Sequence, residues 1–329
     1  MIIGTTTRRR ALSALAAAIA APAALAQAPG WRPSRPVRLV LPFAPGGLTD
    51  ILARQMAEAL SLRLGQSVVV ENRAGAGGNL AAEAVARATP DGHALLVGTQ
   101  GIIEINKALY ARLPYDPDAD FVPLGMLGQQ PNLLVVSPRA FPTQSLAEIL
   151  TAARSRPGGL SYGSNGAGSF THLSMELLRA RTGTPMTHIP YRGSAPMLTD
   201  LVSGTLDLAF DGLGTSLPQV TAGALRGVAV SSAIRSAALP GLPAVADTVP
   251  GFDATPWYGI FAPAGTPPGI LEALEAALQS VLTDAAWARI LADRQVDPLP
   301  GGRASLAAHI AAEREIWREV VRSTGARAD

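Results

Sequence analysis

Cysteine is absent from the 329 residues, and its absence removes several functional classes at once. Without a thiol the chain forms no disulfide, no thiolate nucleophile, no iron–sulfur cluster and no cysteine-ligated zinc site. Lysine is nearly absent too, because Lys107 is the single one in the sequence. The phosphate-binding pattern G-x-x-x-x-G-K-[ST] does not occur, and no G-x-G-x-x-G follows an expected strand. We therefore expect no phosphate-bearing cofactor.

One alanine-rich apolar run stands near the N-terminus. Residues 8–10 are arginines, the apolar run follows, and residues 24–26 read Ala-Leu-Ala, which together are the parts of a secretory signal peptide. We expect residues 1–26 to be removed during export to the periplasm by the Sec or the twin-arginine route. Cleavage would remove three of the 27 basic side chains and none of the 25 acidic ones. The remaining chain would be nearly neutral.

A nearly neutral chain has no basic face for a nucleic acid or an anionic membrane, so we expect neither as a partner. After residue 30 no long apolar run remains, and we expect no membrane-spanning helix there. We expect the exported protein to act as a monomer.

Strand-like and helix-like segments alternate along the rest of the chain, which predicts an α/β fold with largely parallel sheets flanked by helices. The expected strands are residues 37–43, 67–72, 93–99, 132–138, 160–164, 186–191, 205–212 and 259–263. The expected helices are residues 50–65, 79–92, 145–159, 170–183, 195–204, 267–283, 284–294 and 303–325.

Connections rich in proline and glycine at residues 113–131 and 239–256 divide these segments into two sets. We therefore expect two lobes, the first formed by residues 27–130 together with 252–329 and the second by residues 131–251. The chain would pass twice between the lobes and leave a cleft at the crossing. Ligands favour such clefts and the carboxyl ends of parallel strands.

Two glycine-rich turns share one design, and each belongs to a different lobe. In LPFAPGGLTD (residues 41–50) two glycines separate a strand from a helix, and in LSYGSNGAGSFTHL (residues 160–173) Ser169 is placed to cap the helix that follows. A helix N-terminus exposes N–H groups and carries about half a positive charge, which favours an anion. Such a turn can equally be a capped connection in which glycine only supplies a positive φ. The residues alone leave both readings open.

Weaker patterns point to catalysis or metal binding. Residues 159–163 match G-x-S-x-G, but the match lies before and within a strand instead of between a strand and a helix. Residues 116–121 imitate the start of a calcium loop, yet Phe121 replaces the glycine that the turn needs. The only serine–histidine proximity is Ser169 with His172, and such a pair within one helical turn usually serves capping. We expect no catalytic residue, no metal site and no cofactor.

Longer motifs follow one another in the order of a known family. They include PFAPGGLTDILAR, VVVENRAGAGGNLAAEAVARATPDGHALLVGT, SYGSNGAGSFTHLSMELL, HIPYRGSAPMLTDLVSGTLDLAFDG and WYGIFAPAGTPPGILEAL. From about Arg35 onward the chain resembles the periplasmic substrate-binding proteins of tripartite tricarboxylate transporters, the Bug-type family. The resemblance implies a two-lobe Venus-flytrap fold without catalysis. It also implies a small organic anion between the lobes, a di- or tricarboxylate or an acidic amino acid, for delivery to the carrier's membrane subunits or for sensing.

The resemblance further implies that backbone amides and ordered waters at the two glycine turns hold a carboxylate. The residues expected at the ligand are Phe43, Ala44, Gly46, Gly47, Thr49, Asp50, Thr99, Ser164, Asn165, Gly166, Gly168, Ser169, His172, Tyr191, Arg192, Gly193 and Asp211. Asp50 would cap its helix or accept from a ligand hydroxyl, amine or bridging water. Arg192 is either a solvated turn residue or a bidentate partner for a second carboxylate.

Some positions depart from the family or stay open. Leu48 stands where relatives commonly have glycine, which would narrow the first wall of the site. Gln100 and Gly101 lie in a segment that varies and do not identify the ligand. We expect Trp257 and Tyr258 to pack the crossover between lobes instead of contacting ligand. The rival hypothesis is a periplasmic hydrolase or lyase that uses the same cleft loops.

Overall fold

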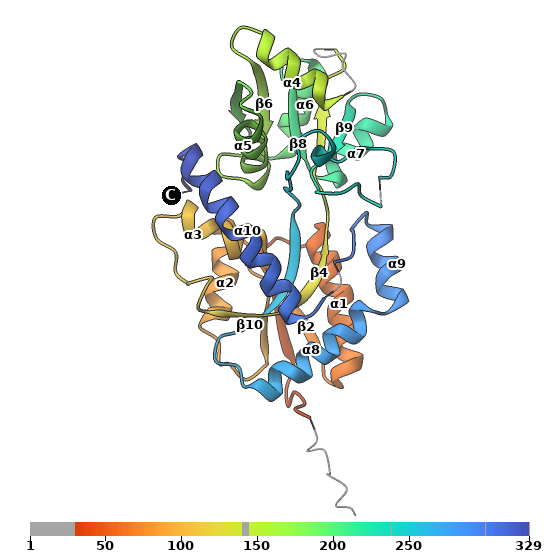
Figure 1. Ribbon diagram of the computed structural model, residues 1–329. Helices are drawn as coiled ribbons and strands as arrows, with labels where there is room; N and C mark the ends of the chain where they lie inside the picture. Colours follow the sequence, from red (N-terminus) through yellow and green to blue (C-terminus); the bar gives the residue numbers. More distant parts are fainter. Residues whose placement is uncertain (1–29, 140–144, 238, 300, 329) are drawn as a thin grey trace, which may run out of the picture. The chain divides into compact units, whose positions relative to one another are not determined.

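The computed structural model describes residues 30–139, 145–237, 239–299 and 301–328. The predicted signal peptide, residues 1–26, lies outside these ranges. Residues 32–329 form one unit by their contacts, and this unit is built on two five-stranded sheets (Figure 1).

Sheet 1 has the strand order β2-β1-β3-β10-β4. Its strands are β1 (Val37–Leu41), β2 (Val68–Asn72), β3 (Ala94–Thr99), β4 (Phe121–Gln129) and β10 (Trp257–Pro263). β1 pairs in parallel with β2 and β3, whereas β10 pairs antiparallel with β3 and β4. β10 is therefore the one strand of sheet 1 that runs against the others.

Sheet 2 has the order β7-β6-β8-β5-β9 and repeats this plan. Its strands are β5 (Leu133–Val136), β6 (Leu160–Ser164), β7 (Met186–Pro190), β8 (Leu208–Asp211) and β9 (Arg226–Val230). β6 pairs in parallel with β7 and β8, and β5 pairs antiparallel with β8 and β9. Here β5 is the reversed strand.

The prediction of largely parallel sheets flanked by helices is confirmed, with one reversed strand in each sheet. The reversed strands, β5 and β10, are those on which the chain enters a sheet from the other sheet. A strand that arrives in this way starts at the facing edge, where the parallel strands end. The carboxyl ends of the parallel strands in both sheets consequently meet at the edges that face each other, and this arrangement positions the site.

Helices connect and cover the strands. They are α1 (Leu48–Leu64), α2 (Asn79–Ala86), α3 (Asn106–Leu109), α4 (Leu146–Ser155), α5 (Phe170–Thr182), α6 (Ser194–Ser203), α7 (Leu213–Thr221), α8 (Pro268–Leu282), α9 (Ala285–Asp293) and α10 (Arg303–Thr324), with short turns η1 (Ala76–Gly78), η2 (Gly101–Ile105) and η3 (Val245–Asp247). α1 buries Leu52, Met56 and Leu60 at helical spacing and ends at Gly65, whose φ of 67° suits a residue without Cβ.

The predicted connection at residues 113–131 is wrong, because it contains β4. Gly125 and Gly128 suggested a turn, but both glycines lie inside the strand for reasons of packing. A Cβ on Gly125 would come within 2.9 Å of Leu278, and one on Gly128 within 2.7 Å of Val296. α7, β9 and η2 were likewise not anticipated.

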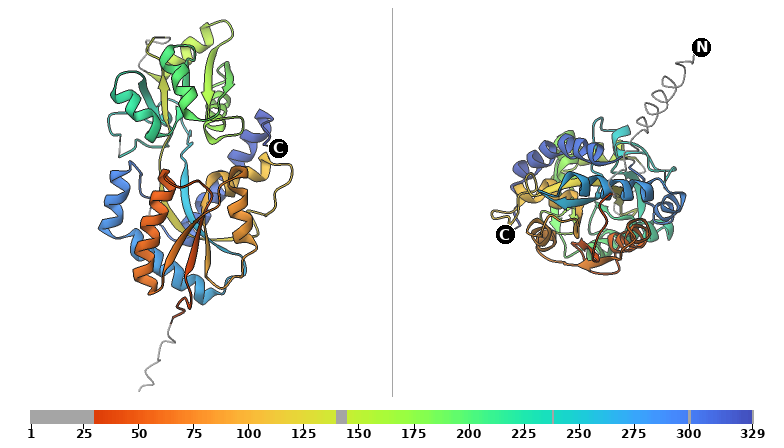
Figure 2. Two further views of the ribbon diagram at one scale, coloured as in Figure 1. Left: turned by 180° about the vertical axis from the view of Figure 1, so that it is seen from behind. Right: turned by 90° about the horizontal axis from the view of Figure 1, so that it is seen from below.

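α10 joins the two halves of the fold. It packs against β4 in sheet 1 and against α5, which covers sheet 2, as Figures 1 and 2 show for the dark blue helix. Trp317 of α10 lies 5.0 Å from the ring of Phe170, centroid to centroid, and shares a core with Leu177 and Phe210. Within the described residues, none of the helices is long and apolar enough to cross a membrane.

Candidate functional site

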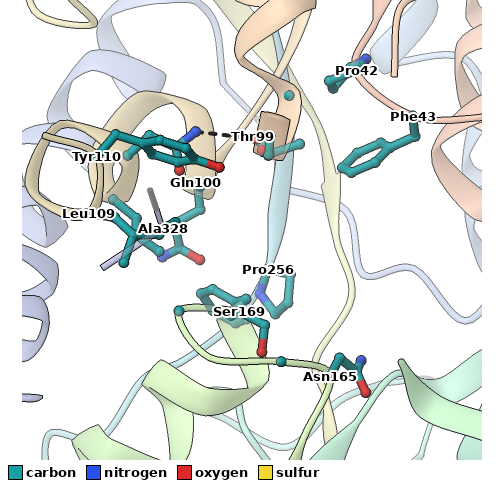
Figure 3. Close-up of a pocket in the computed structure, with 18 of the residues that line it drawn as sticks. Pro42, Phe43, Thr99, Gln100, Leu109, Tyr110, Asn165, Ser169, Pro256 and Ala328 are labelled. Atoms are coloured by element: carbon teal, nitrogen blue, oxygen red, sulfur yellow. Dashed lines mark hydrogen bonds between the residues drawn. The ribbon is translucent and has the colours of Figure 1, made fainter. Parts of the chain in front are cut away.

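A cavity of about 580 Å3 opens where the carboxyl ends of the two sheets face each other. Small-molecule sites typically measure roughly 300–1,000 Å3. In Figure 3, Phe43 and Thr99 lie on one side of it, and Asn165 and Ser169 lie on the other. The wall is formed by residues 42–44, 74, 75, 77, 78, 99–101, 105, 106, 109, 110, 165–170 and 256–258 and by Ala328.

No charged side chain of the described residues lines this cavity. The titratable side chains in its wall are Tyr110 and Tyr258, and burial raises the pKa of both, so both are neutral at pH 7. An anion here would be met by backbone N–H groups and helix N-termini, which favour negative charge without a counter-ion. The cavity therefore suits an anion recognised by backbone dipoles.

Asp50 fixes the conformation of the first glycine turn through hydrogen bonds and does not line the cavity. Its Oδ2 accepts from the Gly46 N–H at 3.1 Å and from Arg54 Nε at 2.9 Å, and its Oδ1 accepts from Asn72 Nδ2 at 2.9 Å. Asn72 also donates to the Phe43 carbonyl at 3.0 Å. The Arg54 hydrogen bond is the largest cause that lowers the pKa of Asp50 to about 2. Asp50 is thus an anionic anchor for the turn.

The residues that this turn presents are fewer than expected. Pro42, Phe43 and Ala44 line the cavity, whereas Gly46 and Gly47 do not. The Phe43 side chain is exposed and points toward the centre of the cavity in Figure 3. Gly47 is the N-cap of α1 and offers no side-chain acceptor. The first N–H groups of α1 consequently have no acceptor within the helix or from its N-cap side chain.

The second glycine turn uses most of its own N–H groups. Those of Asn165, Gly166 and Gly168 donate to side chains around them. The acceptors are Thr171 Oγ1 at 3.0 Å, Ser164 Oγ at 3.2 Å and His172 Nδ1 at 3.1 Å, respectively. The donors left for a ligand are then at Ala167 and Phe170, which also line the cavity. Phe170 opens α5, where the helix itself provides no acceptor for the N–H.

Two stacked histidines support this turn from beneath. The rings of His172 and His188 lie 3.9 Å apart, centroid to centroid, and His188 Nε2 lies 2.7 Å from Ser164 Oγ. Burial lowers the pKa of both rings, that of His188 to about 4, so both are neutral near pH 7. The expectation that Ser169 with His172 is the only serine–histidine proximity is wrong. His172 positions the turn and does not line the cavity.

The Ser164–His188 pair has a structural role. Ser164 is fully buried, and its hydroxyl donates to the Gly166 carbonyl at 3.0 Å. Because the single hydroxyl proton is used there, a neutral His188 satisfies the contact by donating from Nε2. A histidine acting as general base would instead accept the serine hydroxyl proton on Nε2. Ser164 therefore braces the turn and presents no nucleophile to the cavity.

Four other expected residues lie away from the cavity wall. Thr49 is buried in α1. The Tyr191 hydroxyl donates to Asp200 Oδ2 at 2.7 Å, Arg192 is exposed, and Gly193 is the N-cap of α6. Of the two readings for Arg192, the solvated turn residue agrees with this placement.

Asp211 is fully buried and reaches the cavity only indirectly. Its Oδ1 accepts from Ser194 Oγ at 2.6 Å and its Oδ2 from Thr215 Oγ1 at 2.6 Å. The Ser194 hydroxyl also lies 3.3 Å from Asn165 Oδ1, and Asn165 lines the cavity. Burial raises the pKa of Asp211. Asp211 thus positions the wall through Ser194.

A third glycine segment, residues 74–78, was missed as part of the site. Gly75, Gly77 and Gly78 have φ of 132°, 63° and 92° and line the cavity. A Cβ on Gly77 would come within 2.5 Å of the Tyr110 hydroxyl, so this backbone approaches its neighbours closely. The signal was present in the sequence, because these glycines stand between a strand and a helix like those of the other turns.

The remaining wall is mostly apolar and was also largely missed. Leu109 and Tyr110 form one part of it, and Pro256 contributes another part, near Ser169 in Figure 3. Trp257 is fully buried and packs near Phe261, yet it also contributes to the wall. The expectation that Trp257 only packs the crossover is therefore incomplete. Of the residues considered uninformative, Gln100 and Gly101 both reach the cavity.

The calcium-like segment forms ion pairs with basic side chains. Asp118 pairs with Arg314 at 2.9 Å and with Arg318 at 3.0 Å, and Lys107 bridges Asp116 and Asp118 at 2.7 Å each. In the described part of the chain, no group of three or more histidine, aspartate or glutamate residues could hold a metal ion.

Replacing Ser169 by alanine is expected to cost stability and spare binding. Its Oγ accepts from the His172 N–H at 3.3 Å and caps α5, so its loss should lower the free energy of unfolding by about 1 kcal/mol. Urea unfolding and a calorimetric ligand titration measure both effects. Ser145→Ala removes an equivalent cap from α4, with a 3.3 Å bond from Glu148, and is the control. A loss of binding only in Ser169→Ala would contradict the purely structural role.

Comparison with known proteins gives one consistent result. Residues 52–326 match the family model described as tripartite tricarboxylate transporter family receptor. The chain is 36% identical to protein BugT of Bordetella pertussis, over 90% of this chain and 91% of that protein. Rpa4515 of R. palustris, solved with adipate, is 40% identical, with a TM-score of 0.75 and coverage of 89% and 98%. MatC of Rhodopseudomonas palustris, solved with malate, is 34% identical, with a TM-score of 0.72 and coverage of 88% and 99%.

Proposed function

The chain belongs to the tripartite tricarboxylate transporter receptor family, and we propose that it captures a small organic dicarboxylate in the cavity between its two sheets. It is a solute-binding protein of the Bug type. The observation that carries the proposal is a cavity between the two sheets, with the N-terminus of α5 at its edge and no charged side chain among the described residues of its wall.

The ligand class rests on this chemistry and on two relatives. Carboxylates accept hydrogen bonds from N–H groups, and charge-assisted bonds of this kind are stronger than neutral ones. Ala44 and Phe170 both line the cavity and follow Phe43 and Ser169, which lie on opposite sides of it in Figure 3. Their N–H groups would suit an acid with a carboxylate at each end. Adipate and malate, found in Rpa4515 and MatC, are such acids.

The geometry of the described residues offers no support for a hydrolase or a lyase. Ser161, the serine of the G-x-S-x-G match, donates from its hydroxyl to Asp207 Oδ2 at 2.8 Å and does not line the cavity. Ser164 is buried against His188. The family and its structural neighbours are ligand-binding receptors. Binding without turnover is the function that we infer.

Capture would proceed by closure of two lobes, residues 27–130 with 252–329 and residues 131–251, about the strands that cross between them. Residues 1–26 would direct export to the periplasm. The loaded protein would act as a monomer and hand its ligand to the membrane subunits of a tripartite carrier, or report its presence in sensing.

A thermal-shift screen of residues 27–329 tests the proposal. The panel contains adipate, malate, an acidic amino acid, an aromatic acid and adipamide, the neutral diamide of adipate. A ligand at a hundred times its dissociation constant adds about 2.7 kcal/mol of stability. A rise in melting temperature with one of the acids and none with adipamide is expected. A rise with adipamide alone would overturn the proposal that backbone dipoles select an anion.

A further inference from the structure

Gln100 connects the ligand cavity with a buried acidic cluster. It follows β3, lines the cavity and is almost fully buried. Its Nε2 donates to Glu313 Oε2 of α10 at 2.5 Å. Its Oε1 is buried and has no hydrogen-bond partner among the described residues. The Glu313 carboxyl group is thus separated from the cavity by one side chain.

Glu104 lies in the same cluster and is not solvated. It belongs to η2, is 1% exposed, and neither of its carboxyl oxygens has a hydrogen-bond partner within the described ranges. An ionised carboxylate without such partners is costly to bury. Burial raises the pKa of Glu104 well above its usual range, and the nearby charge of Glu313 raises it further. Glu104 is therefore a carboxyl group that favours its protonated form more strongly than a solvated glutamate does.

The titratable groups that face Glu313 from other elements are acidic and do not offset its negative charge. Asp253, which precedes β10, repels it, and Glu104 of η2 adds a second carboxyl group to the cluster, without a positive charge. Burial, followed by the repulsion from Asp253, raises the pKa of Glu313 to about 7. The Gln100 amide is its closest donor, because Trp317 Nε1 lies 3.4 Å from Oε2.

Basic groups on the same helix also leave the carboxyl group largely uncompensated. His309 Nε2 lies 3.4 Å from Glu313 Oε1, but burial lowers the pKa of His309, so the ring is uncharged near neutral pH. The Arg314 guanidinium pairs with Asp118 at 2.9 Å, and its lowering influence on the pKa of Glu104 is smaller than the raising influences of burial and of Glu313. Glu313 and Glu104 together consequently hold less than two negative charges around pH 7.

We propose that Glu313 and Glu104 form a proton-binding site beneath the ligand cavity, and that Gln100 couples this site to the cavity so that capture of an organic anion is accompanied by uptake of a proton. The inference rests on the proposed function, because it requires an anionic ligand. A negative ligand and an ionised Glu313 repel each other across Gln100, where little water intervenes. Ligand binding therefore favours the protonated form of Glu313, and by linkage protonation favours the ligand.

The proton site itself is tested without ligand. An acid whose pKa is raised by folding makes the folded state bind more protons, so stability falls as the pH rises from the unfolded value through the folded one. We expect urea midpoints of wild type to fall between pH 5.5 and 8.5 more steeply than those of Glu313→Gln. Glu104→Gln is a second variant that should flatten the curve in the same way. Glu319→Gln changes an exposed acid of α10 and should follow wild type.

The coupling is tested by calorimetric titration with adipate at pH 6 and pH 8, in buffers of different ionisation enthalpy. One pKa unit of coupling corresponds to a tenfold change in affinity. We expect adipate to bind wild type about fivefold more tightly at pH 6 than at pH 8, because Glu313 titrates only partly within this range, with proton uptake near pH 7. Glu313→Gln should bind equally at both pH values, and the titration of adipate itself is common to all variants.

Two results would overturn the inference: equal pH dependence of affinity in wild type and Glu313→Gln, or identical unfolding curves for the two. Absence of heat with adipate at either pH would count against the proposed dicarboxylate. The unfolding curves would then still decide separately whether the proton site exists.

Discussion

Gly166→Val is expected to abolish ligand binding while the protein stays folded. Gly166 has a φ of 130°, which valine does not adopt without strain, and it lies in the cavity wall. Its carbonyl accepts from the Ser169 N–H at 3.1 Å and its N–H donates to Ser164 Oγ at 3.2 Å. A change of this backbone would move Ala167 and Phe170, whose N–H groups we assign to the ligand. We expect affinity to fall at least a hundredfold in a calorimetric titration, about 2.7 kcal/mol.

Gly223→Val is the matched control. Gly223 has a φ of 73°, is exposed in the turn after α7, and has open space for a side chain, since no atom lies within 4 Å of the position that a Cβ would take. Both variants should lose a similar amount of stability, about 1–3 kcal/mol. Only Gly166→Val should lose the ligand. Unchanged affinity in Gly166→Val would show that the second glycine turn does not contact the ligand.

Asp50→Ala is expected to lower both stability and affinity. The substitution removes the acceptor of Gly46, Arg54 and Asn72 in one step. The loss of hydrogen bonds to a buried carboxylate should cost about 2–4 kcal/mol of unfolding free energy. Because Phe43 and Ala44 belong to the same turn, affinity should fall about tenfold as the wall becomes less ordered. Urea unfolding and ligand titration measure the two effects.

The pH dependence of the unfolding free energy tests whether the ionised Asp50 carboxylate causes this loss of stability. Folding lowers its pKa from 3.8 to about 2, so its stabilising contribution is complete above the unfolded value and is lost as the pH falls through the folded one. The difference between wild type and Asp50→Ala should therefore shrink from pH 5 toward pH 2. Glu58→Ala replaces an exposed acid on α1 and should change neither quantity. An equal effect of both substitutions would refute the anchoring role.

Local patterns predicted the first half of each lobe well. The strand–turn–helix unit β1–α1 has a buried run, two glycines and an apolar period that ends at Gly65, all within about thirty residues. Such a unit is determined by its own sequence. β4 was not predictable in this way, because Gly125 and Gly128 are required by the approach of α8 and of Val296 from distant parts of the chain.

The site shows the same division between local and distant causes. The two glycine turns were anticipated, and both border the cavity. The sequence did not predict which N–H groups remain free to bind a ligand. The Gly46 N–H donates to Asp50 and the Gly168 N–H donates to His172, and both bonds depend on side-chain conformation. The contribution of Ala328 depends on the path of α10 past both sheets, which no local pattern encodes.

A crystal structure of residues 27–329 with adipate tests the central claim most directly. The account predicts adipate between the two sheets, with carboxylate oxygens roughly 2.7–3.2 Å from backbone N–H groups of the first and second glycine turns. Ala167 and Phe170 should be among the donors. An adipate carboxylate paired instead with an arginine side chain, or bound outside the cavity, would contradict the claim that backbone dipoles hold the anion.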